Sequence, residues 1–587
     1  MASPTQPTLQ KRSTILWEGG ELPACVDAAE LALIQSPTEI YQRGTLLVRP
    51  VVQSAMTVRG IRRPDGALTL IPVDAAWLTE GLTRAAVWER KGQKSYERIN
   101  CPRPVVDAYL ARVGQWRVPV LTGIIEAPTL RPDGSILDIQ GYDDQTGLLF
   151  RSSTQFTPIA HQPSRTDALA ALAKLRDVIQ GFPFSEPHDE SVALSAILSG
   201  LIRRSIRSAP MHAFRAPKMA SGKSLLADVV ALIATGRRAA VIPPAPDTNE
   251  ERKRVFAVLL AGDPIASVDN VEHVWNSDVM CSVLTQETYQ DRILGASKTV
   301  TVPTSTFWMC TGNNLTFKGD LTTRVLPSDL DPQTERPEQR LFSRNLYEYI
   351  PEHRDELVNA ALTILRAHHT AGRPRMELKP YGRFEEWSDW VRASLVWLGM
   401  PDPCLSIADM EDADPIRQHL RSLLAAWHAV FGDKAATVTE AIAQATYEGS
   451  DAQYQLMDAL EEVAGEKGRI NQRILGRFLS KYVRRIEGGF RLENAGTYKH
   501  ATKWLVARIP NSPQQSLDFT DVSSRPESSV SFLIPPTRSQ SILPNGEPVG
   551  TLQTPPIDRN PSPARVSSPV SFPLPVVCLP IEAHAPR

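Results

Sequence analysis

Three consecutive residues, Gly222-Lys223-Ser224, have the chemistry that binding of a nucleotide phosphate requires. They stand between a short strand-like run and the long helical sequence SLLADVVALIATG. At such a junction, backbone N–H groups and the helix N-terminus can cradle phosphates, a lysine can reach the β- and γ-phosphates, and a serine hydroxyl can bind Mg²⁺. The sequence therefore predicts that Lys223 contacts the phosphates of ATP and that Ser224 is a ligand of Mg²⁺.

The loop before Lys223 differs from the usual phosphate-binding pattern in one respect. That pattern has a glycine five positions before Gly222, where this chain has Pro217, and a proline ring fixes φ at a negative value. The first part of the loop therefore cannot copy the usual glycine geometry, although the end that makes the key contacts is present. The residues predicted to surround the phosphates are Ala220, Ser221, Gly222, Lys223, Ser224 and Leu225. The alternative is an ordinary helix start with a capping serine.

An acidic residue follows a strand-like apolar run further along the chain. In DPIASVDNV the run ends at Val268, and Asp269 comes next, where a carboxylate can hold Mg²⁺ through water. Asn270 stands where many such ATPases have a second acid that activates water, which leaves the general base open. Glu272 is the nearest carboxylate, but its side chain points the required way only if the strand continues past Asn270. Asp269 could instead be a turn residue at a strand end.

Two more polar residues follow the next strand-like run, STFWMCTGNN. Asn313 can lie between the acid strand and the γ-phosphate and orient the attacking water, or its GNN sequence is simply a turn. Arg324, in KGDLTTRVLPSDLD, can reach the γ-phosphate of a neighbouring subunit and stabilise the transition state. Alternatively, Arg324 forms an ion pair with Asp320, Asp329 or Asp331.

The order of phosphate loop, acid strand, asparagine strand and TTRV resembles the superfamily 3 helicases and related ATPases of phages, viruses and plasmids, within the AAA+ class. This resemblance covers about residues 190–364, and residues 40–510 more loosely resemble helicase- or primase-associated ATPases of phages and integrative elements. It implies a homo-hexameric ring with ATP between subunits and single-stranded DNA in the pore. The residues that match family motifs are Lys223 and Ser224 in the phosphate loop, Asp269 as metal acid, Asn313 as sensor and Arg324 as arginine finger.

A pore-facing β-hairpin occupies the interval between the acid strand and the asparagine strand in that family. Here the interval contains RILGASKTVTVP, in which Gly295 to Lys298 could form the tip. Lys298, with Arg292, would then contact DNA phosphates, which positions DNA without reading its sequence. The alternative is a surface hairpin with a solvated lysine.

A basic helix is predicted near the C-terminus, within a sequence that suggests helices followed by a two-stranded ribbon, as in a winged helix. Arg473, Arg477 and Lys481 are four residues apart and therefore share one face, which suits a groove of duplex DNA. The pair Gly488-Gly489 is predicted to make the turn out of this helix. A solvated basic face on a packing or protein-contact domain is the alternative.

The predicted fold class is α/β, with an AAA+-like P-loop ATPase core, an N-terminal α+β domain, a helical region and a C-terminal winged-helix-like domain. The turn sequence RPDG occurs twice in the N-terminal part, at residues 63–66 and 131–134. The predicted segments are 1–160 (α+β, role unknown), 161–375 (ATPase), 376–450 (helical), 451–510 (winged-helix-like) and 511–587 (a Pro- and Ser-rich tail expected to be disordered).

Composition adds few constraints for a chain of 587 residues with a net charge of −1. Any basic surface must be local, since the net charge gives no general attraction to nucleic acid or membrane. The six cysteines lack the spacing of a zinc site, which suggests reduced thiols in the cytosol, with Cys310 in a core. We find no signal peptide and no apolar stretch long enough to cross a bilayer, so we expect a cytoplasmic protein without membrane contact.

Three functions compete at this point. The first is an ATP-dependent DNA helicase or translocase in replication of a phage or mobile element, with ATP and Mg²⁺ as cofactors. The second is a DNA-binding ATPase switch without unwinding activity, because Asn270 replaces the second acid. The third is a helicase–primase, for which residues 1–160 contain no paired carboxylates or zinc cluster.

Overall fold

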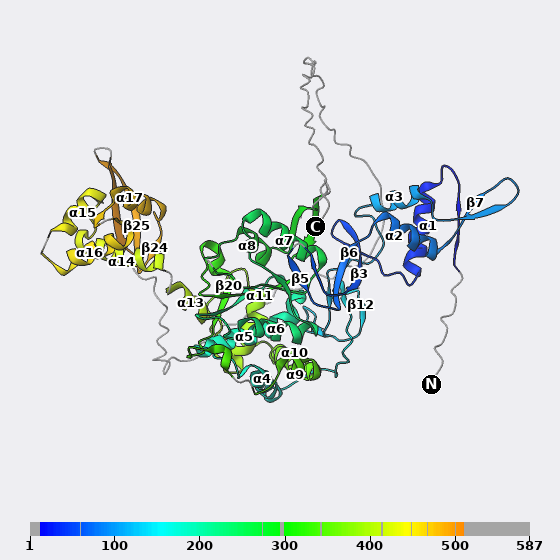
Figure 1. Cartoon of the computed structure of the whole chain (residues 1–587), viewed down its shortest axis with the longest axis horizontal. Helices are drawn as coiled ribbons and strands as arrows, with labels where there is room; N and C mark the ends of the chain where they lie inside the picture. Colours follow the sequence, from blue (N-terminus) through cyan, green and yellow to red (C-terminus); the bar gives the residue numbers. More distant parts are fainter. Residues whose placement is uncertain are drawn as a thin grey trace, which may run out of the picture. The chain divides into compact units, whose positions relative to one another are not determined.

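The computed structural model describes residues 12–509 except 59, 273, 294–298, 341–342, 413–414, 448, 467 and 499–500. The predictions about Lys298 and about the tail, residues 511–587, concern residues outside this description. The described chain has a mixed α/β fold with a largely parallel central sheet and many helices (Figure 1). Its three larger hydrophobic cores are N-terminal, central and C-terminal.

The central sheet has seven strands, and its parallel part brings the predicted site residues to one edge. The parallel strands lie in the order β20 (Val325–Asp329), β14 (Met211–Ala216), β19 (Phe307–Asn313), β16 (Ile265–Val268) and β15 (Ala240–Ile242). Nearly all of their residues are buried, as in parallel strands covered by helices. Since β19 lies between β14 and β16, the phosphate loop, the asparagine and the acid follow adjacent strand ends.

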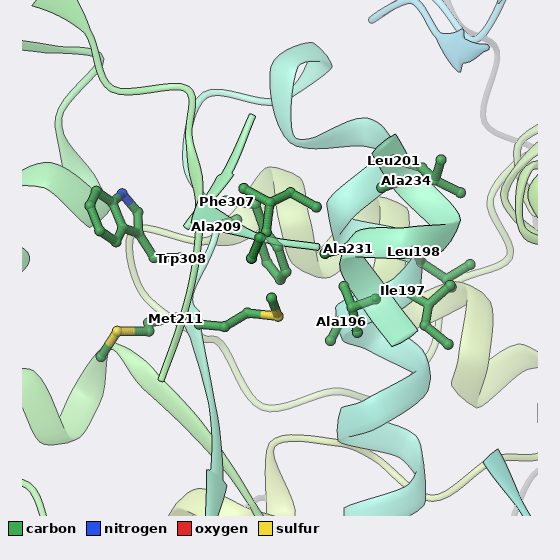
Figure 2. Packing of buried hydrophobic residues seen from close by; sticks show 14 of the residues in the cluster. Ala196, Ile197, Leu198, Leu201, Ala209, Met211, Ala231, Ala234, Phe307 and Trp308 are labelled. Carbon is green, nitrogen blue, oxygen red and sulfur yellow. The ribbon is translucent and has the colours of Figure 1, made fainter. Parts of the chain in front are cut away.

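Helices with small residues pack closely in the central core. Figure 2 shows Ala196, Ile197 and Leu198 of α5 (Pro187–Ile202) close to Ala231 and Ala234 of α6 (Lys223–Thr235). Because these side chains are short, the two helices approach each other closely. The contact buries one face of α6, the helix that follows the phosphate loop. The other helices of this region are α4 (Arg165–Ile179), α7 (Thr248–Ala261), α8 (Asp278–Thr285), α9 (Leu346–Glu352), α10 (Arg354–Thr370), α11 (Glu385–Trp387), α12 (Ala393–Trp397) and α13 (Leu405–Asp412).

The first 160 residues are divided between two cores, although the sequence analysis treated them as one domain. Strands β4 (Met56–Val58) and β5 (Ile61–Arg63) extend the central sheet, because β5 pairs antiparallel with β15. Arg63 makes a buried ion pair of 2.5 Å with Asp263, which fixes this attachment. Further strands of the central core are β2 (Tyr41–Arg43), β3 (Leu46–Gln53), β6 (Ala67–Pro72), β9 (Gly123–Ile125), β10 (Thr129–Leu130) and β13 (Leu148–Phe150).

The rest of the N-terminal segment has a hydrophobic core of its own. It contains β1 (Thr14–Trp17), α1 (Leu22–Gln35), α2 (Ala75–Ala85), β7 (Val87–Lys91), β8 (Tyr96–Ile99) and α3 (Arg103–Ala111). Both RPDG sequences form turns, as predicted: the first lies between β5 and β6, and the second lies between β10 and β11 (Ile136–Leu137). Their glycines, Gly66 and Gly134, have φ values of +73° and +83°. Helix α4 begins with a capping box formed by Ser164 and Asp167.

Two arginines, Arg354 and the partly buried Arg204, stabilise the edge of the central sheet at which its parallel strands begin, here called the amino edge. Arg354, which is 2% exposed, donates to the carbonyl oxygens of Ile233 and Ala234 at the C-terminal end of α6. Arg204 donates to the carbonyl of Gly262 just after α7. A cation at a helix C-terminus is favoured by the helix dipole, and the carbonyls there lack partners within the helix. Burial lowers the pKa of Arg354 to about 10, so its guanidinium stays charged at neutral pH.

The C-terminal core contains four helices and a four-stranded antiparallel sheet. Its elements are α14 (Pro415–Phe431), β21 (Ala436–Thr437), α15 (Val438–Thr446), α16 (Asp451–Ala464), α17 (Gln472–Lys481), β24 (Ile486–Glu487), β25 (Phe490–Tyr498) and β26 (Ala501–Arg508). Since α14 and α15 share this core, it begins before the predicted boundary at 451. The prediction that Gly488-Gly489 leads out of the basic helix is wrong. With φ values of +59° and +81°, these glycines form the two-residue turn between β24 and β25.

The described cysteines are free, and Cys310 is fully buried in β19, as predicted. Among the described residues, every helix is too short or too polar to cross a membrane.

Candidate nucleotide-binding site

The loop between β14 and α6 adopts the backbone that a phosphate cradle requires. Ala220 and Gly222 both have positive φ, at 59° and 99°, and Gly222 is the N-cap residue of α6. Left-handed residues between right-handed ones turn successive backbone N–H groups toward one concave surface. A Cβ atom at Gly222 would also lie 3.3 Å from the ring of Phe182, so glycine is needed here for its conformation and for the close approach.

Lys223 and Ser221 both point into this loop. The Lys223 ammonium donates a 2.8 Å hydrogen bond to the Lys218 carbonyl, and the Ser221 hydroxyl donates to the same oxygen at 2.8 Å. Burial lowers the pKa of Lys223, and the nearby Asp269 carboxylate opposes that shift. A phosphate in the loop would give this partly desolvated ammonium a stronger, charged partner. Leu225, also predicted at this site, packs against the central core and anchors the first turn of α6.

A chain of hydroxyl and carboxylate oxygens joins α6 to two neighbouring strands. Ser224 Oγ donates to Asp269 Oδ1 at 3.1 Å, and Thr311 Oγ1 donates to the same oxygen at 2.6 Å. Thr311 in turn accepts the backbone N–H of Asn270 at 3.1 Å. A serine hydroxyl beside a carboxylate is an oxygen donor set that suits Mg²⁺, which keeps several water ligands. The role of Thr311 was missed, although its place before Gly-Asn-Asn on the adjacent strand was a usable signal.

Asn313 ends the strand that lies between the phosphate-loop strand and the acid strand. Its side-chain oxygen is buried and has no hydrogen-bond partner among the described residues. The alternative interpretation of this sequence was a turn. The next residue, Asn314, makes that turn: its φ is 48°, and its N–H donates to the Ala216 carbonyl. Asn313 therefore retains unused hydrogen-bonding capacity at the edge of the phosphate loop.

The strand before Asp269 does not continue as far as Glu272. Strand β16 stops at Val268, and Asn270 has a left-handed φ of 61°. The Asn270 side-chain amide donates to Glu272 Oε1 at 2.7 Å, and the Glu272 side chain is exposed.

Arg324 contacts Asp320 of the same chain. Its guanidinium is 3.5 Å from the Asp320 carboxylate and donates to the Asp320 carbonyl at 3.1 Å, and its side chain is only 12% exposed. Of the three acids considered as alternatives, Asp320 is therefore the ion-pair partner. Asp329 instead pairs with Arg215. Arg324 Nε is buried without a hydrogen-bond partner among the described residues.

A pocket of about 430 Å³ adjoins Ser224 and Asp269 and was not predicted. Asp228, one turn after Ser224 on α6, lines it and accepts a 2.8 Å hydrogen bond from the Tyr347 hydroxyl. Arg238 stacks on the Tyr347 ring at 4.1 Å and lies 3.6 Å from Asp228. Burial raises the pKa of Asp228, and nearby Asp269 adds to that rise, while the Tyr347 hydrogen bond and Arg238 oppose it.

The predicted DNA-binding residues of the C-terminal region line one groove. Arg473, Arg477 and Lys481 share it with Thr439 at the start of α15 and Thr502 of β26, and its volume is about 690 Å³. The three cations are exposed on α17, as the four-residue spacing predicted. In the central region, β17 (Thr288–Arg292) and β18 (Thr299–Pro303) form an antiparallel hairpin, with Arg292 opposite Thr299. The tip with Lys298 lies outside the described residues.

Comparisons with known proteins found likenesses only among solved structures. No family model matches this chain, and no curated protein matches it. An apo structure of the NrS-1 C-terminal region matches with a TM-score of 0.37 and 12% identity, over 81% of this chain and 98% of that one. A structure of SCCmec type IV Cch, described as an active helicase, matches with a TM-score of 0.30 and 11% identity, over 81% and 98%. The JCV helicase matches with a TM-score of 0.19 and 13% identity, over 40% and 74%.

Proposed function

We propose that residues 161–375 bind and hydrolyse ATP, and that the chain couples hydrolysis to unwinding of DNA, or to translocation along it, in replication of a phage or mobile element. One observation carries this proposal: the Ser224 hydroxyl at the head of α6 lies 3.1 Å from the Asp269 carboxylate at the end of β16. This contact joins two residues 45 positions apart in the chain, and it supports their roles as part of a phosphate loop and as a metal acid.

Each residue of the site has a separate task in this proposal. The backbone N–H groups of residues 220–225 and the start of α6 bind the phosphates, and Lys223 offsets their negative charge. Asn313 uses its free amide oxygen to orient the attacking water. Ser224 and Asp269 would hold Mg²⁺, which neutralises charge on the phosphates when it is bound.

DNA is assigned to two basic elements. The groove beside α17, in a winged-helix-like domain, would bind duplex DNA through Arg473, Arg477 and Lys481. The β17–β18 hairpin would contact single-stranded DNA in the pore of a homo-hexamer, together with Lys298, which the sequence predicts at its tip. In that ring, Arg324 would serve the ATP of the neighbouring subunit after leaving Asp320.

A DNA-binding ATPase switch without unwinding activity is the second candidate. The observation that favours it is Asn270, a neutral residue directly after the metal acid. A switch needs ATP binding to change assembly on DNA, but it does not need rapid turnover.

The decisive experiment measures phosphate release by the full chain with and without single-stranded DNA, together with its mass in solution with ATP and strand displacement on a forked duplex. We expect DNA to stimulate phosphate release, ATP to favour a hexamer, and strands to separate. An Asp269→Asn variant is the control, since it keeps the size of the side chain and removes the charge. Slow hydrolysis unaffected by DNA, with ATP-dependent assembly on DNA, would favour the switch. Absence of ATP binding would contradict both candidates.

A further inference from the structure

Hydrolysis of ATP requires a group that takes a proton from the attacking water, and few carboxylates near the phosphate loop are available for it. Asp269 already accepts hydrogen bonds from Ser224 and Thr311 and is the metal acid of the proposed site. Asp329 is joined to Arg215 through two guanidinium nitrogens, at 2.7 and 2.5 Å. Neither carboxylate is free to act as a base.

Asp228 is also excluded, by its position along α6. It lies one turn after Ser224, which places it about 5–6 Å further from the helix N-terminus where phosphates bind. Its carboxylate accepts the Tyr347 hydroxyl and lies beside Arg238, in the pocket behind the Ser224–Asp269 pair. A base must instead stand beyond the phosphates, at the carboxyl edge of the sheet.

The backbone that leads to Glu272 is fixed against β19 near that edge. The Val271 N–H donates to the Thr311 carbonyl at 2.9 Å. The Val271 carbonyl packs so closely on Gly312 that a Cβ there would lie 2.3 Å from its oxygen. The segment therefore passes alongside the strand one residue before Asn313, whose buried amide oxygen has no hydrogen-bond partner among the described residues.

The left-handed turn at Asn270 gives the Glu272 side chain its direction. With a φ of 61°, Asn270 bends the chain after the acid strand, and its amide donates to Glu272 Oε1 at 2.7 Å. Asparagine tolerates this conformation better than most residues, so one side chain provides both the turn and the hydrogen bond. A glutamate held by one amide retains three further lone-pair sites for a water molecule.

We propose that Glu272 is the catalytic base for ATP hydrolysis and that Asn270 is its positioning residue, an inference that rests on the proposed ATPase function. Glu272 takes one proton from water as the water oxygen forms a bond to the γ-phosphorus. The bond between that phosphorus and the β–γ bridging oxygen breaks, and ADP leaves with the electron pair on that oxygen. The proton on Glu272 then passes to solvent, which restores the carboxylate.

The test compares two variants of the full chain with wild type in phosphate release, binding of a fluorescent ATP analogue and thermal unfolding. Glu272→Gln should lower kcat by about 100-fold or more, since loss of a general base costs about 10²–10⁴-fold. Its Kd for the analogue should stay within about twofold of wild type, because a base contributes little to ground-state binding. Glu335→Gln is the matched control: it removes one exposed carboxylate from the loop that contacts Lys218 through Thr334, and it should hydrolyse ATP normally.

Asn270→Gly separates positioning from folding. Glycine keeps the left-handed turn without strain and removes the side chain with its amide, so the melting temperature should change little. We expect kcat to fall by about 10-fold, the effect of one hydrogen bond, with the Kd for the ATP analogue unaltered. A lowered melting temperature that accounts for the whole loss would mean that Asn270 is structural.

The possible failures are distinguishable. If wild type hydrolyses ATP and Glu272→Gln does so equally well, the assignment of Glu272 is wrong while the ATPase proposal stands. A loss in Glu335→Gln but not in Glu272→Gln would move the base to the other loop. If wild type binds the analogue but releases no phosphate, with DNA or without it, both the base and the hydrolytic function are rejected.

Discussion

The two edges of the central sheet are both rich in charged side chains, yet they use them differently. At the amino edge, Arg354 and Arg204 donate to backbone carbonyls at or just after helix C-termini, and they act as structural cations. At the carboxyl edge, Lys223 is bonded only within its own loop, and Asn313 retains a free amide oxygen. Burial of charge alone therefore does not identify a site in this protein. At the carboxyl edge, the Lys223 ammonium and the Asn313 amide oxygen add unused hydrogen-bonding capacity beside the phosphate loop.

The largest expected effect is a loss of ATP turnover, from a substitution at the carboxyl edge, where the parallel strands end. Lys223→Ala should abolish ATP turnover, to below about one thousandth of the wild-type rate, because the Lys223 ammonium points into the loop, whereas that of Lys218 donates to the Thr334 carbonyl. Its free energy of unfolding should change by less than about 1 kcal/mol, since the ammonium is held by a single loop carbonyl. Phosphate release and urea unfolding measure the two quantities. Normal hydrolysis by a folded variant would remove the phosphate-loop assignment and with it the contrast between the edges.

At the amino edge, we expect a substitution to lower the stability of the fold. Arg354→Ala leaves the carbonyls of Ile233, Ala234 and Glu126 without their donor, so it should lower the free energy of unfolding by about 3–5 kcal/mol. Arg84→Ala is the control, because its ion pair with Glu80 is exposed and should contribute no more than about 1 kcal/mol. Equal losses in the two variants would show that the buried network is not structural.

The comparison extends to the C-terminal region, where the cations of α17 are exposed in a groove. Replacement of Arg477 and Lys481 with alanine should weaken loading on duplex DNA and flatten its salt dependence by up to about 0.9 log units per lost phosphate contact. Unwinding per loaded ring should survive. Fluorescence anisotropy across a salt series measures the slope, and an unchanged slope would make this groove a protein-contact surface.

The smallest expected effect is a small change in stability, from a substitution in the phosphate loop. Ala220 has a φ of 59°, which costs an L-residue about 1–2 kcal/mol, whereas glycine adopts it freely at a smaller entropic cost. Ala220→Gly should therefore raise the free energy of unfolding by about 0.5 kcal/mol and keep ATP hydrolysis. A clear loss of activity would indicate that the methyl group, rather than the backbone, shapes the cradle.

The sequence predicted the convergence at the carboxyl edge better than any other feature. Lys223, Ser224 and Asp269 follow strand-like runs, and parallel strands bring their carboxyl ends to one edge, so their proximity could be anticipated. The hydrogen bonds at the amino edge could not be predicted from the sequence. Arg354 donates to the carbonyl of Glu126, which is 228 residues away, and no local pattern marks such a contact. The glycine pair 488–489 was misassigned because a separate turn, with Arg484 at a φ of 67°, already ends the basic helix.

The attachment of β5 to the central sheet also has a consequence for synthesis of the chain. Arg63 and its partner Asp263 are 200 residues apart, so at about 5–20 residues per second the first waits roughly 10–40 s for the second on the ribosome. During that interval, the β4–β5 hairpin presents strand edges that have no sheet to join. Nascent chains should therefore be most prone to aggregation before residue 263 emerges, and a chaperone that binds exposed strands would act at that stage.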